Sequence, residues 1–329
     1  MTNASQQALR SSFAETLPAE TDPGGRVVVR ADGIAEDWLT AHGDALRAAV
    51  TEHGAVLVRG LDLRDIDQVV GAYRALPVEL LTDREAFAPR SVYADGVYSS
   101  SQWPADQPMC MHHELSYAGT VPGLLAMACL RAPEEGGATA TADAAAVLAA
   151  LPSDVVDRFT EHGWSLVRSY NGEVGVSLAE SFGTDDRAEI ENYCRANGIE
   201  FDWGVDGALR TRQRRPAVLR HPVTGVDCWF NQIAFLNEWT MAPEVRQYLV
   251  DVYGADGLPF TTRFGDGSPI DEGVVEAINA VYEAHTVRHP WQAGELMLVD
   301  NIRTAHSTEP YAGDRQIVVA MAEPVRRDA

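Results

Sequence analysis

The sequence predicts a single domain with a mainly β core and helical insertions. Short apolar stretches separated by Gly, Pro and Asp begin at residue 91, and two more apolar stretches lie near the carboxyl end. The long segment between them has helical periodicity. Because the early and late strands need each other to complete a sheet, a domain boundary would have to cut that sheet. One domain spanning residues 1–329 is therefore more economical than two.

The amino-terminal part has the pattern of a helix, a strand and a second helix. Residues 1–25 are polar and contain no apolar signal segment, so we expect a flexible arm on a cytoplasmic protein. Residues 40–54 have helical periodicity and end at Gly54, a favourable C-cap. Residues 55–60 form an apolar strand, and residues 64–76 return to the helical pattern.

The β core is expected to combine three early strands with two late ones. These strands are residues 91–100, 111–117, 124–130, 294–301 and 315–324. Helical periodicity is found in residues 144–162, 184–198, 241–254 and 271–286. The segment from about 144 to 290 is therefore predicted to be a largely helical insertion or lid. No apolar run reaches the ~20 residues that a membrane-spanning helix needs.

The charge of the chain excludes two classes of partner. Asp and Glu number 48 and Lys and Arg number 26, which gives a formal charge of −22. Such a charge repels nucleic-acid phosphates and anionic membrane surfaces. Residues 209–220 are an exception because five arginines gather there, and we expect a solvated positive loop in preference to an anion site. The four cysteines lack C-x-x-C spacing and are too few for a disulfide scaffold, which fits a reducing cytoplasm.

The stretch MHHELSY, residues 111–117, combines residue types that bind metals. In an extended strand, neighbouring side chains alternate between faces, so His112 and Glu114 would share one face and His113 would point the other way. The second histidine must then come from elsewhere, and His306, in the loop between the two late strands, is the best candidate. A His-x-carboxylate pair with a distant histidine is the facial triad that holds Fe(II) and leaves positions open. Taken alone, such a tripeptide is more often a polar feature of a surface or a core.

Arg315 adds a further feature to this pattern. It opens the last strand, where an antiparallel return from the His306 loop would turn its side chain toward the same cavity. A planar guanidinium suits a bidentate grip on the distal carboxylate of a keto acid. An iron, a keto acid chelated to it and this arginine would together make an oxygen-activating site.

Four blocks of sequence occur in a fixed order. They are MHHELSY, the pattern P-x-L-L-x-x-x-C-L-x-x-P-x-x-G-G-x-T over residues 122–139, HPVTGVDCWFNQ, and GELMLVDNIRTAHSTEPYAGDRQIVVA. Together they resemble the taurine dioxygenase (TauD/TfdA) superfamily, and within it the syringomycin-biosynthesis hydroxylase-like and clavaminate synthase-like members. The resemblance covers about residues 54–319. It implies a double-stranded β-helix, or jelly-roll, core with helical insertions.

The resemblance also implies the cofactors and the residues that hold them. Fe(II) would be bound by His112, Glu114 and His306, and the co-substrate 2-oxoglutarate by Thr139 and Arg315, with O2 as the oxidant. The family usually reads GGET where this chain reads GGAT, so one residue departs from the pattern while the Thr139 hydroxyl is retained. On sequence grounds alone, Thr139 is equally suited to cap the helix that follows.

The implied reaction is hydroxylation of an unactivated C–H bond with release of succinate and CO2. Halogenases of this family replace the carboxylate ligand by a small residue, so Glu114 argues against halogenation. Desaturation and cyclisation stay open because they need only a different substrate pose. Relatives act on amino acids or related natural-product precursors, so we expect such a substrate and a role in antibiotic biosynthesis.

Six residues are candidates for contact with the substrate: Gln102, Arg210, Arg212, Arg220, Trp229 and Asn231. Trp229 and Asn231 match a stretch that lines the cavity in relatives, although an aromatic pair in a strand is more often core. Gln102 stands where many relatives carry an acidic residue. The arginines would hold a substrate carboxylate as part of a lid.

Two alternatives remain open at this point. The first is an amino acid tethered to a carrier protein; carriers are usually acidic, so they would be repelled unless the arginines of residues 209–220 dock them. The second is a zinc-dependent hydrolase or a non-catalytic ligand-binding barrel. A hydrolase would not need Arg315, and a binding module would form no succinate.

Overall fold

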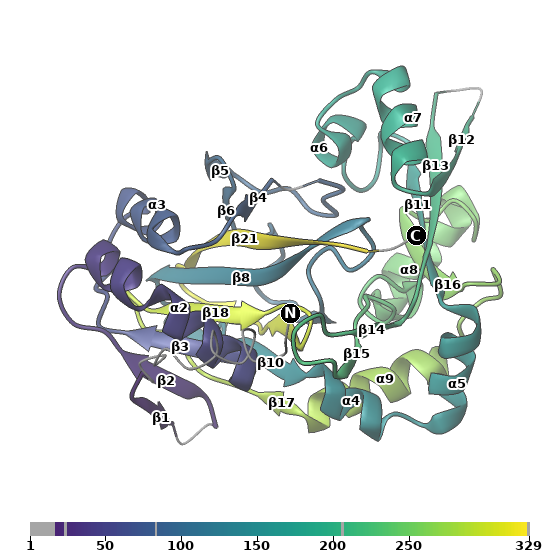
Figure 1. The fold of residues 1–329 in the computed structure, drawn as a ribbon. Coiled ribbons are helices and arrows are strands. Elements are labelled where there is room, and N and C mark those ends of the chain that lie inside the picture. The colour runs from purple at the N-terminus through teal and green to yellow at the C-terminus, as the bar shows by residue number, and fades with distance from the viewer. Residues whose placement is uncertain (1–16, 23–24, 83, 205–206, 328–329) are drawn as a thin grey trace, which may run out of the picture.

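The computed structural model describes residues 17–22, 25–82, 84–204 and 207–327 (Figure 1). Two facing β-sheets make up its centre. The larger sheet has the strand order β1-β2-β3-β18-β8-β21-β6-β5, with β4 also paired to β21, and the smaller has the order β17-β10-β19-β7. Almost all neighbouring strands in the two sheets pair antiparallel. The exception is β2 with β3 in the larger sheet, which pair in parallel.

The larger sheet is formed by β1 (Ala19–Thr21), β2 (Val27–Arg30), β3 (Ala55–Arg59), β4 (Leu80–Leu81), β5 (Val92–Ala94), β6 (Val97–Ser99), β8 (Thr120–Arg131), β18 (Leu296–Asp300) and β21 (Gln316–Arg326). The smaller sheet is formed by β7 (Met109–His112), β10 (Thr139–Asp143), β17 (Thr286–Val287) and β19 (Thr304–Thr308). A two-stranded ribbon is formed by β9 (Glu135–Gly136) and β20 (Tyr311–Ala312).

Alternation along β8 divides the core into two layers. Leu124, Ala126 and Ala128 point to one side, where α2 (Ala35–His53) and α3 (Ile66–Ala75) cover the larger sheet (Figure 1). Leu125 and Met127 point to the other side and belong to the core between the two sheets. Because both faces of this strand are buried, it reads as a continuous apolar run.

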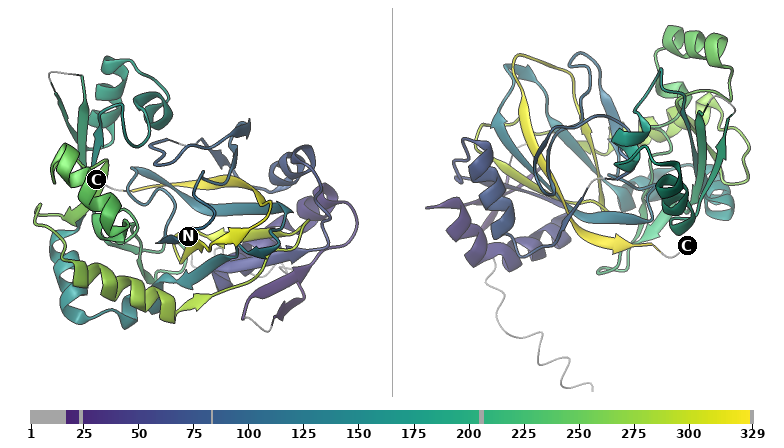
Figure 2. Two further views of the ribbon diagram at one scale, coloured as in Figure 1. Left: turned by 180° about the vertical axis from the view of Figure 1, so that it is seen from behind. Right: turned by 90° about the horizontal axis from the view of Figure 1, so that it is seen from above.

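The insertion follows β10 and lies at the opposite end of the core from α2 and α3, as Figure 2 shows from behind and from above. Its helices are α4 (Ala144–Ala150), α5 (Ser153–His162), α6 (Leu178–Phe182), α7 (Arg187–Ala196), η1 (Glu238–Thr240), α8 (Pro243–Tyr253) and α9 (Glu272–Ala284). They accompany a four-stranded antiparallel sheet of β12 (Ile199–Trp203), β13 (Leu209–Arg215), β11 (Trp164–Tyr170) and β16 (Phe260–Phe264), and a hairpin of β14 (Val218–Arg220) and β15 (Asp227–Trp229). The predicted helices are present, but the sheet and hairpin were not predicted.

The arginine-rich segment is a strand and not the solvated loop that we expected. In β13, Leu209, Thr211 and Gln213 are buried, while Arg210 and Arg214 are exposed. The period of two was concealed because two of the inward residues are polar, so hydrophobicity did not mark a strand.

Three further local predictions need correction. The strand carrying the first histidine ends at His112, because residues 114–117 form a turn in which Leu115 has a φ of 52°. His306 lies within β19 and not in a loop. Of the predicted arm, residues 1–25, the described part includes β1, which pairs with β2 and so belongs to the sheet; residues 1–16 and 23–24 lie outside the described residues.

Candidate active site

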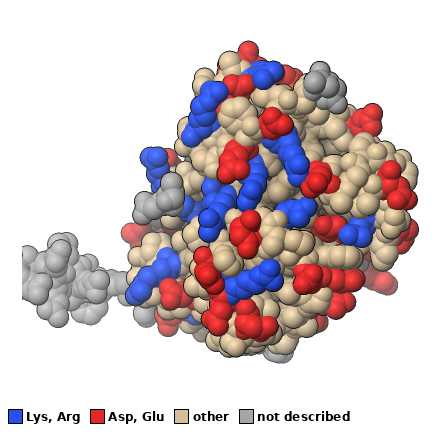
Figure 3. Space-filling view, turned by 90° about the vertical axis from the view of Figure 1, so that its right-hand side faces the viewer, with Lys and Arg blue, Asp and Glu red and all other residues tan. Residues whose placement is uncertain are grey.

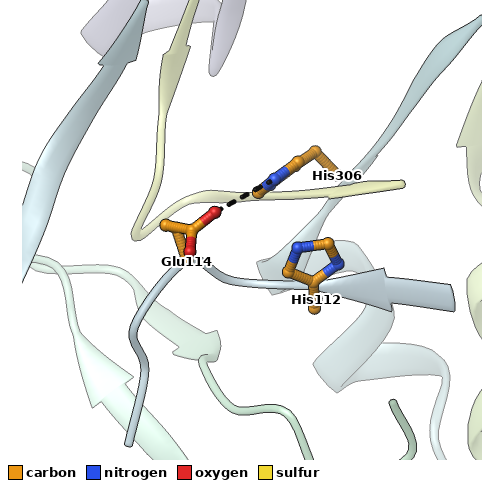
Figure 4. Close-up of side chains that lie close together, drawn as sticks. All are labelled: His112, Glu114 and His306. Carbon is orange, nitrogen blue, oxygen red and sulfur yellow. Dashed lines mark ion pairs between the residues drawn. The ribbon is translucent and has the colours of Figure 1, made fainter. Parts of the chain in front are cut away.

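The smaller sheet brings two histidines face to face. His306 in β19 is the cross-strand partner of His112 at the end of β7, and their ring centroids are 4.3 Å apart. Glu114, in the turn after β7, places its Oε2 3.9 Å from Nε2 of His306 (Figure 4). One ligand atom from each of these three side chains lies within 4.8 Å of the other two. All three side chains are buried, so the cluster has the composition and size of a metal site.

Both imidazoles are prepared to bind a cation as neutral ligands. The Nδ1 of His112 donates a hydrogen bond to the carbonyl oxygen of Cys110 over 2.9 Å, which leaves the Nε2 lone pair available. Burial lowers the pKa of His112 and lowers that of His306 further, because desolvation disfavours the charged ring. A neutral imidazole is the form that ligates metals.

Asn301 fixes the backbone of the turn that carries Glu114. Its Oδ1 accepts from the Glu114 N–H over 2.8 Å, and its Nδ2 donates to the Glu114 carbonyl over 3.0 Å. The main-chain carbonyl of Asn301 also accepts from Nδ1 of His113 over 2.6 Å. His113 is thereby held in the wall of the site, outside the His112–Glu114–His306 cluster, and burial lowers its pKa to about 4.

Arg90 holds the Glu114 carboxylate. Its NH2 donates to Glu114 Oε2 over 3.0 Å, and its Nε donates to Ser101 Oγ over 3.0 Å. Both side chains of the ion pair are nearly fully buried, so the guanidinium offsets a carboxylate charge that would otherwise be costly at this depth. Sequence reasoning did not find Arg90, because no motif surrounds it and its contact with Glu114 is made only in the folded chain.

One cavity connects this cluster to the predicted keto-acid residues. Thr139 opens β10, and Arg315 precedes β21 by one residue. Arg315 donates through NH2 to Thr139 Oγ1 over 3.3 Å and through Nε to the Gly137 carbonyl over 3.1 Å. Besides His112, Glu114 and His306, the residues that line this cavity include Arg90, Ser100, Ser101, Trp103, Met127, Thr139, Tyr311, Arg315, Ile317 and Val319.

Aromatic side chains cover the His112 side of the site. Phe235 stacks on the His112 ring at 4.6 Å, and Phe87 meets that ring edge-on at 6.4 Å. The ring centroid of Trp103 lies 5.9 Å from that of Phe235. These rings come from separate parts of the chain and exclude water from one side of the imidazole, which strengthens electrostatic interactions inside the cavity.

A family model described as "Taurine catabolism dioxygenase TauD, TfdA family" matches residues 23–321. The chain belongs to this family. The chain is 34% identical over 294 residues to the dapdiamide synthesis protein DdaC of Enterobacter agglomerans, and the match covers 89% of each chain. It is 25% identical over 289 residues to a clavaminate synthase-like protein of Arabidopsis thaliana, covering 84% of each.

Solved structures of TauD-like proteins share the fold. PvcB of Pseudomonas aeruginosa superposes with a TM-score of 0.55 at 15% identity, covering 97% of this chain and 98% of the other. A putative alpha-ketoglutarate-dependent taurine dioxygenase of Burkholderia xenovorans gives a TM-score of 0.52 at 18% identity, covering 94% and 95%. The predicted jelly-roll core with helical insertions is thereby confirmed.

TauD-family enzymes use Fe(II), 2-oxoglutarate and O2, and the cavity of this dioxygenase fits that set. Two neutral imidazoles and one carboxylate are the donor set of a facial triad. The half-buried guanidinium of Arg315 beside the Thr139 hydroxyl offers donors to a carboxylate. Family membership decides against the zinc hydrolase and the non-catalytic barrel that the sequence left open.

The alternative role of Thr139 as a helix cap is wrong. Thr139 lies in β10, paired with Thr308 of β19. The helix that follows, α4, is capped by Asp143, whose Oδ1 accepts from the backbone N–H groups of Ala145 and Ala146.

None of the six predicted substrate residues lines the cavity. Trp229 is fully buried against Phe159 at 5.5 Å, and Asn231 donates to the Ala217 carbonyl over 3.0 Å, so both have structural contacts. Gln102 is exposed, although the residues on either side of it do line the cavity.

The three predicted arginines lie on the insertion. Arg210 pairs with Asp256 at 3.3 Å, Arg212 donates to the Gly265 carbonyl over 3.2 Å, and Arg220 ends β14 with its side chain exposed. Figure 3 shows basic side chains gathered on this face of the molecule with acidic ones between them. No helix in the described part of the chain is long and apolar enough to cross a membrane.

Proposed function

We propose that this TauD-family dioxygenase hydroxylates an unactivated C–H bond of a free amino acid or an amino-acid-derived natural-product precursor. In this proposal His112, Glu114 and His306 bind Fe(II), and Thr139 and Arg315 bind 2-oxoglutarate. The observation that supports it is the convergence of the His–Glu–His cluster and the Arg–Thr pair on one cavity. His112, His306 and Thr139 come from the smaller sheet, and Arg315 precedes β21 of the larger sheet, so only the folded core unites them.

The residues of the site would each have a separate task. When bound, Fe(II) and O2 supply the oxidising chemistry, in which one oxygen atom enters the C–H bond and the other enters succinate as 2-oxoglutarate loses CO2. Arg315 and Thr139 would orient the co-substrate by its distal carboxylate. Arg90 would keep the Glu114 carboxylate in place. Phe235 and Phe87 would exclude water from the His112 side.

Two features favour an amino-acid-like substrate. The wall of the cavity beside Glu114 is polar, because Arg90 contacts Glu114 and Ser101 contacts Arg90, and Ser100 and Trp103 also line the cavity. Such a wall suits a small polar molecule with a short apolar part. The relative at 34% identity is a dapdiamide synthesis protein, which supports a natural-product pathway. Hydroxylation is the simplest outcome; desaturation and cyclisation would need the same site with another substrate pose.

A carrier-tethered amino acid is the second candidate. It rests on the arginine-bearing face of the insertion, where an acidic carrier would meet local positive charge despite the net charge of −22. Arg210 and Arg263 on that face both pair with Asp256, which reduces its positive potential. We therefore prefer the free substrate.

The deciding experiment is an aerobic incubation with Fe(II), ascorbate and 2-oxoglutarate against a panel of free amino acids. Succinate and substrate mass are followed together. We expect one amino acid to gain one oxygen in step with succinate. A loss of two hydrogens in place of that gain would establish desaturation or cyclisation. Background succinate across the whole panel, with turnover only of carrier-loaded amino acids, would overturn the free-substrate proposal.

Matched variants connect the reaction to the cavity. Arg315→Met should abolish coupled succinate formation at ordinary 2-oxoglutarate concentrations. Arg131→Met is the control, because Arg131 ends the neighbouring strand β8 with a largely exposed side chain that pairs with Asp314. Equal loss in both variants would mean that the effect is not specific to the cavity.

A further inference from the structure

Trp291 lies behind the Thr139 end of the cavity and was not among the predicted site residues. It precedes β18, and only 7% of its surface is exposed. Its indole Nε1–H donates to Thr139 Oγ1 over 3.1 Å. Arg315 donates to the same oxygen over 3.3 Å. The Thr139 hydroxyl oxygen therefore receives two hydrogen bonds from groups that can only donate.

This arrangement determines where the hydroxyl proton of Thr139 goes. A hydroxyl oxygen has two lone pairs and one O–H, so two incoming bonds use both lone pairs and leave the proton to be donated. Among the described residues, no protein acceptor takes that proton. Thr139 lines the cavity, so the proton is available to an acceptor inside it.

The rest of Thr139 is also held in place. Its backbone is paired with Thr308 across β10 and β19, and its carbonyl accepts from Arg26 NH2 at 3.5 Å. Trp291 itself is packed within the core between the two sheets. The hydroxyl is thus fixed by a rigid frame, with the indole as its support on the side away from the cavity.

We propose that Trp291 is a positioning residue for 2-oxoglutarate: by donating to Thr139 Oγ1, it directs the Thr139 O–H toward the distal carboxylate of the co-substrate. The proposal rests on the proposed function for the roles of Thr139 and Arg315. Trp291 does not itself line the cavity. Its effect reaches the co-substrate only through the hydroxyl.

The test compares two keto acids on Fe(II)-loaded protein under anaerobic conditions by titration calorimetry. They are 2-oxoglutarate and 2-oxopentanoate, which has a methyl group in place of the distal carboxylate. Trp291→Phe removes the N–H and keeps an aromatic ring. We expect the dissociation constant of 2-oxoglutarate to rise about three- to tenfold, the range for one hydrogen bond. The dissociation constant of 2-oxopentanoate should not change.

The matched control is Trp164→Phe. Trp164, at the start of β11 in the insertion, is also buried and belongs to the same apolar cluster, and its Nε1 has no hydrogen-bond partner among the described residues. This variant should bind both keto acids as the parent does. In a Thr139→Val background, Trp291→Phe should have no further effect, because the bond that it breaks is already absent.

Several results would overturn the proposal. Unchanged 2-oxoglutarate affinity in Trp291→Phe, or an equal loss for both keto acids, would exclude action through the distal carboxylate. If Trp291→Phe does not fold, as judged by its melting temperature, Trp291→Leu removes the same N–H and is judged by the same criteria. Failure of the proposed function is distinguishable, because Thr139→Val and Arg315→Met would then also leave 2-oxoglutarate affinity unchanged.

Discussion

Arg90 and Glu114 form a buried ion pair at the centre of the proposed iron site. The guanidinium joins Glu114 to Ser101, so one carboxylate oxygen is already held before a metal arrives. A ligand fixed in advance loses less conformational freedom on binding, which favours metal affinity. Arg90 thus contributes to the site although it supplies no ligand atom.

Replacement of Arg90 tests this role. Arg90→Met removes a charge-assisted hydrogen bond worth about 1.5–3 kcal/mol and leaves Glu114 buried without it. We expect the Fe(II) dissociation constant, measured by anaerobic equilibrium titration, to rise by about one to two orders of magnitude. Arg246→Met is the control. Arg246 also makes an ion pair, with Glu238, but neither residue of that pair lines the cavity. Parent-like iron affinity in Arg90→Met would contradict the role.

Single residues differ in how far the sequence reveals them. His112, Glu114 and His306, which the structure brings into one cluster, could be proposed from the sequence because a His-x-Glu pair and a distant histidine occur within the ordered blocks of a family pattern. Arg90 and Trp291 could not, because each acts through a partner distant in the chain, Glu114 in one case and Thr139 in the other. Trp229 and Asn231 were wrongly favoured for the cavity, since family position alone does not distinguish a wall residue from the core behind it.

A short segment, residues 84–90, links the insertion to the metal-type cluster and is called the strap. Arg168 of β11 donates to the carbonyl oxygens of Glu85 and Ala86, and the Tyr117 hydroxyl donates to Glu85 as well. The buried Glu85 carboxylate accepts from the Tyr193 hydroxyl of α7 over 2.8 Å. The insertion therefore supports the element that carries Phe87 and Arg90 to the cavity.

The buried carboxyl group of Glu85 in the strap should make the stability of the fold depend on pH. Burial raises the pKa of Glu85, while Tyr193 and Arg168 act to lower it. The folded protein therefore holds this proton more tightly than the unfolded chain does. Stability from Glu85 is present below the ordinary carboxyl pKa and is lost as the pH rises through the raised folded-state pKa.

Glu85→Gln makes the side chain permanently neutral and retains an acceptor for Tyr193. We measure the free energy of unfolding of this variant and of the parent with urea. We expect the value for the variant minus the value for the parent to increase as the pH rises from about 5 to about 7, because only the parent loses stability there. Glu276→Gln removes the same charge at an exposed position of α9 and serves as control. A difference between Glu85→Gln and parent that stays constant across this range would contradict the explanation.

At the level of elements, strong periodicity was a reliable guide. The helix, strand and helix of α2, β3 and α3 were predicted from their patterns, as were β8, β18 and β21. The turn after β7 was not, because Asn301, far along the chain, determines it. Strand β13 was missed because its buried face carries Thr211 and Gln213.

The whole molecule carries a formal charge of −22 on 329 residues. At low ionic strength the excess carboxylates repel one another over long distances and oppose the compact state. The Debye length falls from about 30 Å at 0.01 M to about 3 Å at 1 M salt, so added salt screens this repulsion. Figure 3 shows that one face carries basic and acidic side chains side by side.

We therefore expect the melting temperature to rise by a few degrees between about 0.01 M and about 1 M sodium chloride. Potassium chloride at equal ionic strength should give the same rise, since screening does not depend on which monovalent cation is present. A fall in melting temperature with salt would show that local ion pairs outweigh the net repulsion.

In the whole molecule, the site forms only where both sheets of the jelly roll and the strap come together. Arg315 directly precedes β21 of the larger sheet, the smaller sheet provides His112, Thr139 and His306, and the strap closes one side with Arg90. The sequence predicted that the early and late strands would meet. Side-chain direction within the cavity could be known only from their register.

The most direct test of the central claim is an anaerobic titration of 2-oxoglutarate into Fe(II)-loaded protein, followed by the visible absorption that a keto acid gains on chelating Fe(II). The parent should develop this absorption with one equivalent of 2-oxoglutarate. His112→Ala and His306→Ala should not, while His42→Ala on α2, remote from the cavity, should behave as the parent. Full absorption in either triad variant, or none in the parent, would contradict the assignment of this cavity as the iron and 2-oxoglutarate site.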